Sequence, residues 1–97
     1  MAQVEVESGT RERINQWLER LIDAWQRLPQ VEKEIDGWDL IERIDYVEEW
    51  NPKEALLDQL KSDDRAGLMD DAQMRRYAEL QELAARHRPI LTRLQQG

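Results

Sequence analysis

The chain contains no cysteine and no phenylalanine, and it has one histidine, three prolines and four glycines in 97 residues. Without cysteine, disulfides and thiolate metal sites are excluded, so the fold must be stabilised by packing. With His87 as the single histidine, sites that need two histidine ligands are excluded as well. The few glycines are scattered, and no glycine-rich loop is present to hold a phosphate.

Long apolar runs and a surplus of basic charge are also absent. No segment approaches the roughly 18 consecutive apolar residues of a membrane span, and the start, MAQVEVESGT, lacks the features of a signal peptide. A net charge of −7 argues against direct nucleic-acid binding, because phosphate contacts need clustered Lys and Arg. We therefore expect a cytoplasmic protein that binds neither membranes nor nucleic acid directly.

The aromatic residues that are present are mainly tryptophans, and they are candidates for core or interface anchors. A buried aromatic side chain removes about 150–250 Å² from water. The four tryptophans are Trp17, Trp25, Trp38 and Trp50. The length fits one domain, and no Gly/Pro/Ser-rich linker divides it. We expect a flexible tail over residues 1–9 and a single helical domain over residues 10–97.

The spacing of apolar residues predicts an all-α fold. From Ile14 to Leu28 they recur at three- and four-residue steps, which predicts a first helix over 10–28. Thr10 is its expected N-cap, and Pro29 its expected end. The segment 29–37 is either a loop or one further helical turn.

A second helix is predicted over 38–50, and the residues expected on its inner side are Ile41, Ile44 or Asp45, Val47 or Glu48, and Trp50. The next residues, Asn51-Pro52-Lys53-Glu54, resemble a helix start, with Asn as the N-cap, Pro at the first position and Glu at the third. A third helix is therefore predicted over 52–62. Ser62-Asp63-Asp64, followed by Gly67, is expected to stop it.

The clearest local motif lies between Met69 and Met74. Asp70 can cap a helix, Gln73 can complete the capping box, and the two methionines occupy the positions of a hydrophobic staple. A helix is predicted over 71–88, with a break at Pro89 and a short fifth helix after it. An unbroken helix to residue 96 would be about 39 Å long and would project from a compact domain. The predicted architecture is an irregular bundle of four main helices.

Acidic residues are concentrated in the middle of the chain. The net charge is −1 over residues 1–31, −8 over 32–64 and +2 over 65–97. An ordinary solvated surface is the simpler interpretation, because exposed ion pairs are common and weak. The sharper hypothesis is an acidic docking face for a basic partner. Its residues are Asp39, Glu42, Asp45, Glu48, Glu49 and Asp58.

Each candidate for catalytic or metal chemistry has a simpler structural explanation. A calcium loop with Gly67 at its sixth position would start at Ser62 and place Ala66 and Gln73 at ligand positions, so we reject it. His87 lies near Thr92 only if the helix breaks, and no oxyanion-hole motif accompanies them. We expect no catalytic residue, no metal and no cofactor, and therefore no enzyme.

The apolar stripes on the first and last long helices are wider than a short bundle needs. This excess predicts self-association, most simply a two-fold dimer, or binding of a partner helix. The candidate interface residues are Trp17, Trp25, Tyr77, Leu80, Leu91 and Leu94. The alternative is an acidic inhibitor or antitoxin-like decoy that docks on the nucleic-acid-binding surface of a basic protein. The last thirty residues resemble small bacterial helical proteins, a likeness that implies no function.

Overall fold

The computed structural model describes residues 7–96, so most of the predicted tail over 1–9 lies outside the described part. The predicted all-α class is confirmed, and the described residues contain no strand. The elements are α1 (Ser8–Glu34), a 3₁₀ turn (Ile35–Gly37), α2 (Leu40–Glu48), α3 (Trp50–Arg65) and α4 (Asp71–Gln96). The first helix begins at Ser8, so the expected N-cap, Thr10, is wrong by about one turn.

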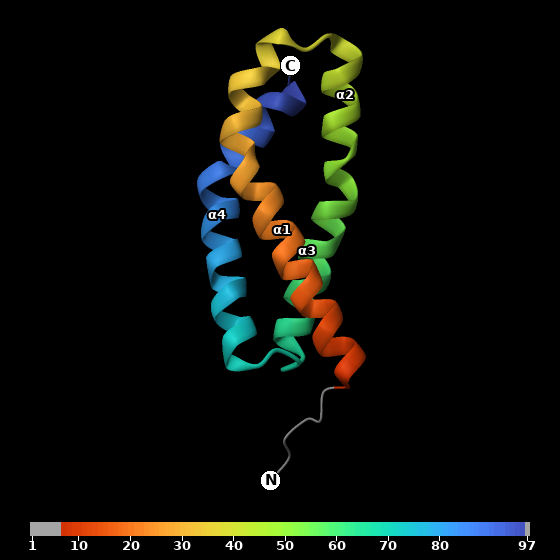
Figure 1. Cartoon of the computed structure of the whole chain (residues 1–97), viewed down its shortest axis with the longest axis vertical. Helices are drawn as coiled ribbons and strands as arrows, with labels where there is room; N and C mark the ends of the chain where they lie inside the picture. The colour runs from red at the N-terminus through yellow and green to blue at the C-terminus, as the bar shows by residue number, and fades with distance from the viewer. Residues whose placement is uncertain (1–6, 97) are drawn as a thin grey trace.

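The helices form three long rods, which replace the predicted irregular bundle of four main helices. Glu49, the one residue between α2 and α3, keeps a helical backbone at φ −62° and ψ −20°. The two helices therefore run on as one rod, with α1 and α4 as the others (Figure 1). Each rod is antiparallel to the next in the chain, and the molecule measures 56 × 20 × 17 Å.

Pro29 lies inside α1, so the predicted end of the first helix at residue 28 is wrong. A proline here removes one hydrogen bond, the one to the carbonyl of Trp25. The apolar stripe nevertheless continues past it, because Val31 packs against the core and Ile35 is only 5% exposed. Burial on both sides of Pro29 outweighs the single lost bond, and the ambiguous segment is helical.

The predicted break at Pro89 is wrong for the same reason. Helix α4 runs through it without interruption, and no separate fifth helix exists in the described residues. Leu91 and Leu94, which follow the proline, are 1% and 5% exposed. The unbroken helix does not project, because the other two rods have about the same length.

The predicted start of the third helix, with Asn51 as its N-cap and Pro52 at its first position, is also wrong. Helix α3 begins at Trp50, and Glu49 still donates its N–H to the carbonyl of Asp45, at 3.1 Å. Trp50 is 1% exposed, and its burial stabilises the helical conformation of this segment. Pro52 is tolerated because it falls in the first turn of α3.

Helix α3 ends three residues later than predicted, at Arg65. Asp63, expected in the helix stop, is instead a buried acceptor, held by two hydrogen bonds of 3.2 and 3.3 Å from the Arg13 guanidinium. The predicted role of Gly67 is confirmed. With φ 72° it lies in the left-handed region, and the N–H of Leu68 donates to the carbonyl of Asp63 in a Schellman motif.

The capping box before α4 is confirmed. The N–H of Gln73 donates to Asp70 Oδ1 at 2.8 Å, and the N–H of Asp70 donates to Gln73 Oε1 at 3.0 Å. The amide of Gln73 also donates to Asn15 Oδ1 at 2.9 Å and to the carbonyl of Arg11. The motif therefore both starts α4 and fastens it to the first turns of α1. Of the two staple residues, Met69 is buried and Met74 is 43% exposed.

One core runs along the rods, and the contact between α1 and α4 is the most extensive. Helix α1 contributes more of its buried residues than any other element, and α3 adds Trp50 and Leu60. The members less than 2% exposed are Ile14, Leu18, Leu21, Trp25, Leu28, Trp50, Leu60, Leu80 and Leu91.

A Pro89→Ala variant tests the unbroken α4. Alanine restores one backbone hydrogen bond at an exposed position, so the free energy of unfolding should rise by up to about 3 kcal/mol. Urea denaturation followed by circular dichroism measures this change. A variant equal to or less stable than the wild type would mean that the helix does not continue through residue 89.

The buried Asp63 is tested by Arg13→Gln, with Arg27→Gln as the matched control. Arg27 forms an exposed ion pair with Asp23, whereas the Asp63 side chain is 3% exposed. Loss of Arg13 leaves the carboxylate with Gln59 alone, so the free energy of unfolding should fall by about 1–3 kcal/mol. The control should lose less than about 0.5 kcal/mol. Equal losses in the two variants would contradict the structural role of Arg13.

Candidate functional site

Five of the six predicted interface residues lie in the core of the single chain. Their side chains are between 0% and 5% exposed, so they are not free to contact a partner in this structure. They are Trp25, Tyr77, Leu80, Leu91 and Leu94. Trp17 is half-buried, and the guanidinium of Arg13 lies 4.5 Å from the centroid of its ring. The wide stripes on α1 and α4 are used within the fold.

Five of the six predicted acidic residues are brought together along α2 and its two ends. None of them forms an ion pair with another described residue. They are Asp39, Glu42, Asp45, Glu48 and Glu49. Asp39 also has a structural role, because its Oδ1 accepts the N–H of Glu42 at 2.8 Å and caps α2. Asp58 lies apart, on α3, where its charge acts on Tyr77 of α4.

Helix α2 presents apolar side chains to solvent. Leu40, Ile41 and Ile44 are 63%, 70% and 46% exposed, and no residue of α2 is fully buried. The prediction that Ile41 and Ile44 lie on the inner side is therefore wrong. Val47 and Trp50 lie on the inner side as predicted, and Tyr46 packs against the core beside them. We call Leu40, Ile41 and Ile44 the apolar ridge.

A shallow hollow borders the apolar ridge on the side of the α4 C-terminus. Its volume is about 280 Å³. It is lined by Leu40, Arg43, Ile44, Val47, Glu48, Leu94 and Gln95. Arg43, the single base of α2, is half-buried, and its Nε has no hydrogen-bond partner in the described structure. The solvent-facing charges of α2 are therefore carboxylates.

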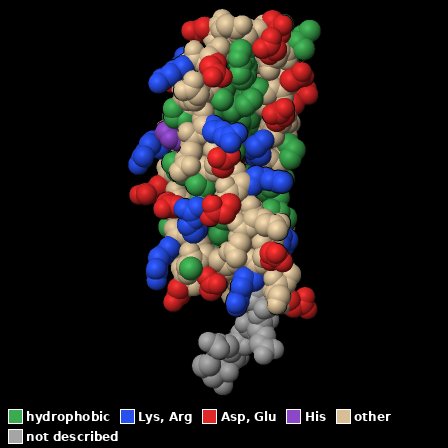
Figure 2. Space-filling view, in the orientation of Figure 1, with side chains coloured by type: hydrophobic (Ala, Val, Ile, Leu, Met, Phe, Trp, Pro, Cys, Tyr) green, Lys and Arg blue, Asp and Glu red, His purple; other side chains and the backbone are tan. Residues whose placement is uncertain are grey.

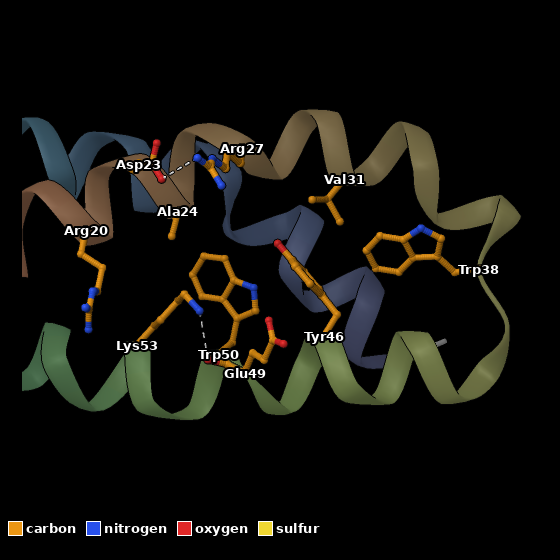
Figure 3. Close-up of a pocket in the computed structure, with 10 residues that line it drawn as sticks. All are labelled: Arg20, Asp23, Ala24, Arg27, Val31, Trp38, Tyr46, Glu49, Trp50 and Lys53. Carbon is orange, nitrogen blue, oxygen red and sulfur yellow. Dashed lines mark hydrogen bonds and ion pairs between the residues drawn. The ribbon is translucent and has the colours of Figure 1, made fainter.

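A larger groove lies on the other flank of α2, between α1 and the α2–α3 rod (Figure 3). Its volume is about 400 Å³. Its lining residues are Arg20, Asp23, Ala24, Arg27, Val31, Trp38, Tyr46, Glu49, Trp50 and Lys53. We call it the aromatic groove. It was not predicted from the sequence, because its residues come from segments far apart in the chain.

Three aromatic side chains form the wall of the aromatic groove on the α2–α3 side. The ring centroids of Trp38 and Tyr46 are 5.4 Å apart, and those of Tyr46 and Trp50 are 6.4 Å apart. Trp50 also contacts Trp25 in the core, with centroids at 4.8 Å. All three pairs are edge-to-face, the arrangement that aromatic quadrupoles favour. The wall is therefore continuous with the packed interior.

Figure 2 shows the face of the molecule that carries α1 and α2. Hydrophobic side chains gather between the upper halves of α1 and α2, and acidic side chains follow the outer edge of α2. Lys and Arg side chains lie below the hydrophobic area, toward the middle of the molecule. Asp23 and Glu49 also line the groove, so its charges are of both signs.

The phenols of Tyr46 and Tyr77 both hold their protons more tightly than a free tyrosine. Burial raises the pKa of Tyr46 above 10.0; the nearby indole of Trp50 opposes this shift, and the charge of Glu49 adds to it. Burial also raises the pKa of Tyr77, helped by the charge of Asp64. Both side chains are therefore neutral hydrogen-bonding groups at physiological pH.

The remaining candidates for chemistry are not assembled in the described residues. The unbroken α4 separates His87 and Thr92 by five positions, which places them on different sides of one helix. No group of three or more His, Cys, Asp or Glu side chains in the described part is arranged to hold a metal ion. None of the described helices is long and apolar enough to cross a membrane.

Comparison with known proteins identifies no relative of this chain: no family model, no curated protein and no solved structure matches it.

The raised tyrosine pKa values predict how stability depends on pH. The folded chain binds these protons more tightly than the unfolded chain, so stability is unaffected below pH 10.0 and falls as pH rises through the folded-state pKa values. Absorbance of tyrosinate during an alkaline titration measures each pKa, with Tyr46→Phe and Tyr77→Phe assigning the two steps. A phenol that titrates at or below 10.0 in the folded protein would contradict the structure.

Proposed function

We propose that the protein is a non-enzymatic interaction module whose α2 face binds a basic, amphipathic helix of another protein. The apolar ridge is the observation that carries the proposal. With Met74, its three members are the only large hydrophobic side chains that the described structure leaves exposed. Full burial of a Leu or Ile side chain contributes about 1.5–3 kcal/mol, so a partner that covered the ridge would gain a useful part of its affinity there.

The charges around the ridge favour a basic partner over a second copy of the chain. A two-fold interface brings the same patch of both subunits together, so Glu48 and its neighbours would face identical carboxylates. A helix with Lys or Arg beside its apolar face would instead meet Asp45 and Glu48, which lie one turn after Ile41 and Ile44, with opposite charge. This partner chemistry is also that of the inhibitor or decoy hypothesis, in which the basic helix belongs to a nucleic-acid-binding protein.

Self-association is the second candidate, and it would have to use the same face. The stripes that predicted a dimer lie in the core, which leaves the apolar ridge and the hollow beside Leu94 as the exposed apolar surface on which two chains could meet. Sedimentation of the purified protein separates the two candidates. The protein is measured at a concentration about ten times the dissociation constant of the peptide described below. If it sediments with the mass of one chain, the result favours the heterologous partner.

A model peptide tests the proposal directly. The probe is a fluorescent amphipathic helix of about 18 Leu and Lys residues, and its matched control has Glu in place of Lys. Fluorescence anisotropy should show saturable binding of the basic peptide that weakens between about 0.1 and 1 M salt, as the Debye length falls from about 10 to 3 Å. The acidic peptide should not bind.

Variants of the ridge show where the peptide binds. Ile41→Lys combined with Ile44→Lys should weaken binding at least about tenfold, because it removes two apolar contacts and adds like charge. Met74→Lys, on α4, adds a positive charge at another exposed apolar position and should change the affinity less than about twofold. Equal effects of the two changes, or equal binding of the acidic peptide, would refute the proposal.

A further inference from the structure

Two cations at one end of the aromatic groove have no carboxylate partner among the described residues. Arg20 extends from α1, whereas the Lys53 side chain on α3 turns away from it toward Trp50 (Figure 3). Lys53 Nζ donates to the backbone carbonyl of Glu49 at 3.2 Å and lies 5.6 Å from the centroid of the Trp50 ring. Arg27, by contrast, is paired with Asp23 at 3.2 Å. The uncompensated positive charge is therefore concentrated at the Arg20–Lys53 end.

The wall of the groove contains a buried hydrogen-bond donor that is weakly satisfied. Trp50 is 1% exposed, and its Nε1 makes no hydrogen bond of normal geometry in the described structure. Figure 3 shows this nitrogen on the edge of the ring that faces Tyr46, and the Tyr46 hydroxyl is the acceptor within its reach, because the Trp50 indole lowers the pKa of that phenol. A ligand oxygen with better geometry would replace this weak contact.

The rest of the groove suits the hydrophobic body of a small molecule. Ala24 and Val31 of α1 face Trp38, Tyr46 and Trp50 across it. A volume of about 400 Å³ is in the usual range for small-molecule sites, about 300–1,000 Å³, which are mostly apolar with a few polar groups.

The charges limit the ligand to one negative group. Glu49, which lies beside Trp50 and Tyr46 in Figure 3, would repel a second negative charge placed toward that end. The chain as a whole carries −7, which also disfavours polyanions such as nucleotides.

We infer that the aromatic groove binds a small amphiphilic monoanion, a carboxylate or sulfonate with an aromatic or aliphatic body. The head group lies against the Lys53 ammonium, the Arg20 guanidinium adds positive charge at the same end of the groove, and the body lies against the aromatic wall. This site is independent of the proposed function, because its residues lie on the opposite flank of α2 from the apolar ridge.

The test uses anilinonaphthalene sulfonate as the probe and the full chain as the receptor. Its fluorescence should rise in a saturable titration with one molecule bound per chain. Octanoate should displace it, whereas octanol, which has the same body without the charge, should be at least about tenfold less effective. Equal displacement by the two competitors would overturn the inference, because the charge would then have no role.

The indole N–H signals in a ¹H–¹⁵N correlation spectrum locate the ligand. The chain has four tryptophans, so four signals are expected. Octanoate should shift those of Trp50 and Trp38 most and leave that of Trp17 unchanged, because Trp17 does not line the groove. Shifts that are largest at Trp17, or no shift at Trp50, would overturn the inference.

Paired variants test the head-group site. Arg20→Gln with Lys53→Gln should weaken probe binding about tenfold, the effect of losing two partly exposed ionic contacts. The control, Arg75→Gln with Arg86→Gln, makes the same change of charge at two exposed positions of α4 and should have less than about a twofold effect. Equal weakening in both pairs would show that only net charge matters and would overturn the inference.

The ridge variant separates this inference from the proposed function. Ile41→Lys with Ile44→Lys should abolish binding of the basic peptide and retain binding of the probe. If the basic peptide rather than octanoate shifts the Trp50 signal, the groove belongs to the protein interface and the small-molecule inference is wrong. Thermal unfolding of each variant checks that the fold is kept.

Discussion

The burial of one continuous apolar stripe on α1 is the constraint on which the rest of the structure depends. Leu18, Leu21 and Leu28 are at most 1% exposed, and Ile35 continues the stripe beyond the end of the helix. Helices gain most of their stability from packing of such a face, and here the face runs along most of α1. Its partners must therefore run along its whole length, which explains the unbroken α4, the joined α2–α3 rod and the extended shape.

The periodic stripes, the capping box at Asp70 and the turn at Gly67 could be predicted because each depends on neighbours in the sequence. The wrong helix ends lie at the prolines. Local rules give the cost of a proline inside a helix but not the free energy gained by burying the residues that follow it. A proline inside a helix costs about 3 kcal/mol, whereas each large apolar residue that follows contributes about 1.5–3 kcal/mol when buried. Val31 and Ile35 after Pro29, and Leu91 and Leu94 after Pro89, decide the outcome in favour of the helix.

The candidate sites were predictable only where they follow from composition. The concentration of acidic residues in α2 can be counted directly in the sequence. Ile41 and Ile44 of the apolar ridge, however, were predicted to face the core. Helix α2 has only nine residues, so its sequence allows two different faces to be apolar. One face contains Ile41 and Ile44, and the other contains Tyr46 and Val47. The contact of Trp50 with Trp25 fixes the second face as the buried one, and that contact joins two helices. The aromatic groove depends on the same pairing, which one sequence does not reveal.

The two sides of α1 differ in how completely they are closed, and this difference supports the proposal of a binding surface beside α2. Across the α1–α4 seam, Arg76 pairs with Glu19 and Arg93 pairs with Glu32, both at 2.5 Å, above a continuous core. Exposed pairs of this kind add little stability, but they neutralise the charges of these four side chains. Beside α2 the carboxylates form no ion pair with any described residue, and Ile41 remains in water. Because unpaired charges and exposed apolar side chains contribute nothing to the fold, their presence together on one short helix supports the proposal that α2 binds a partner.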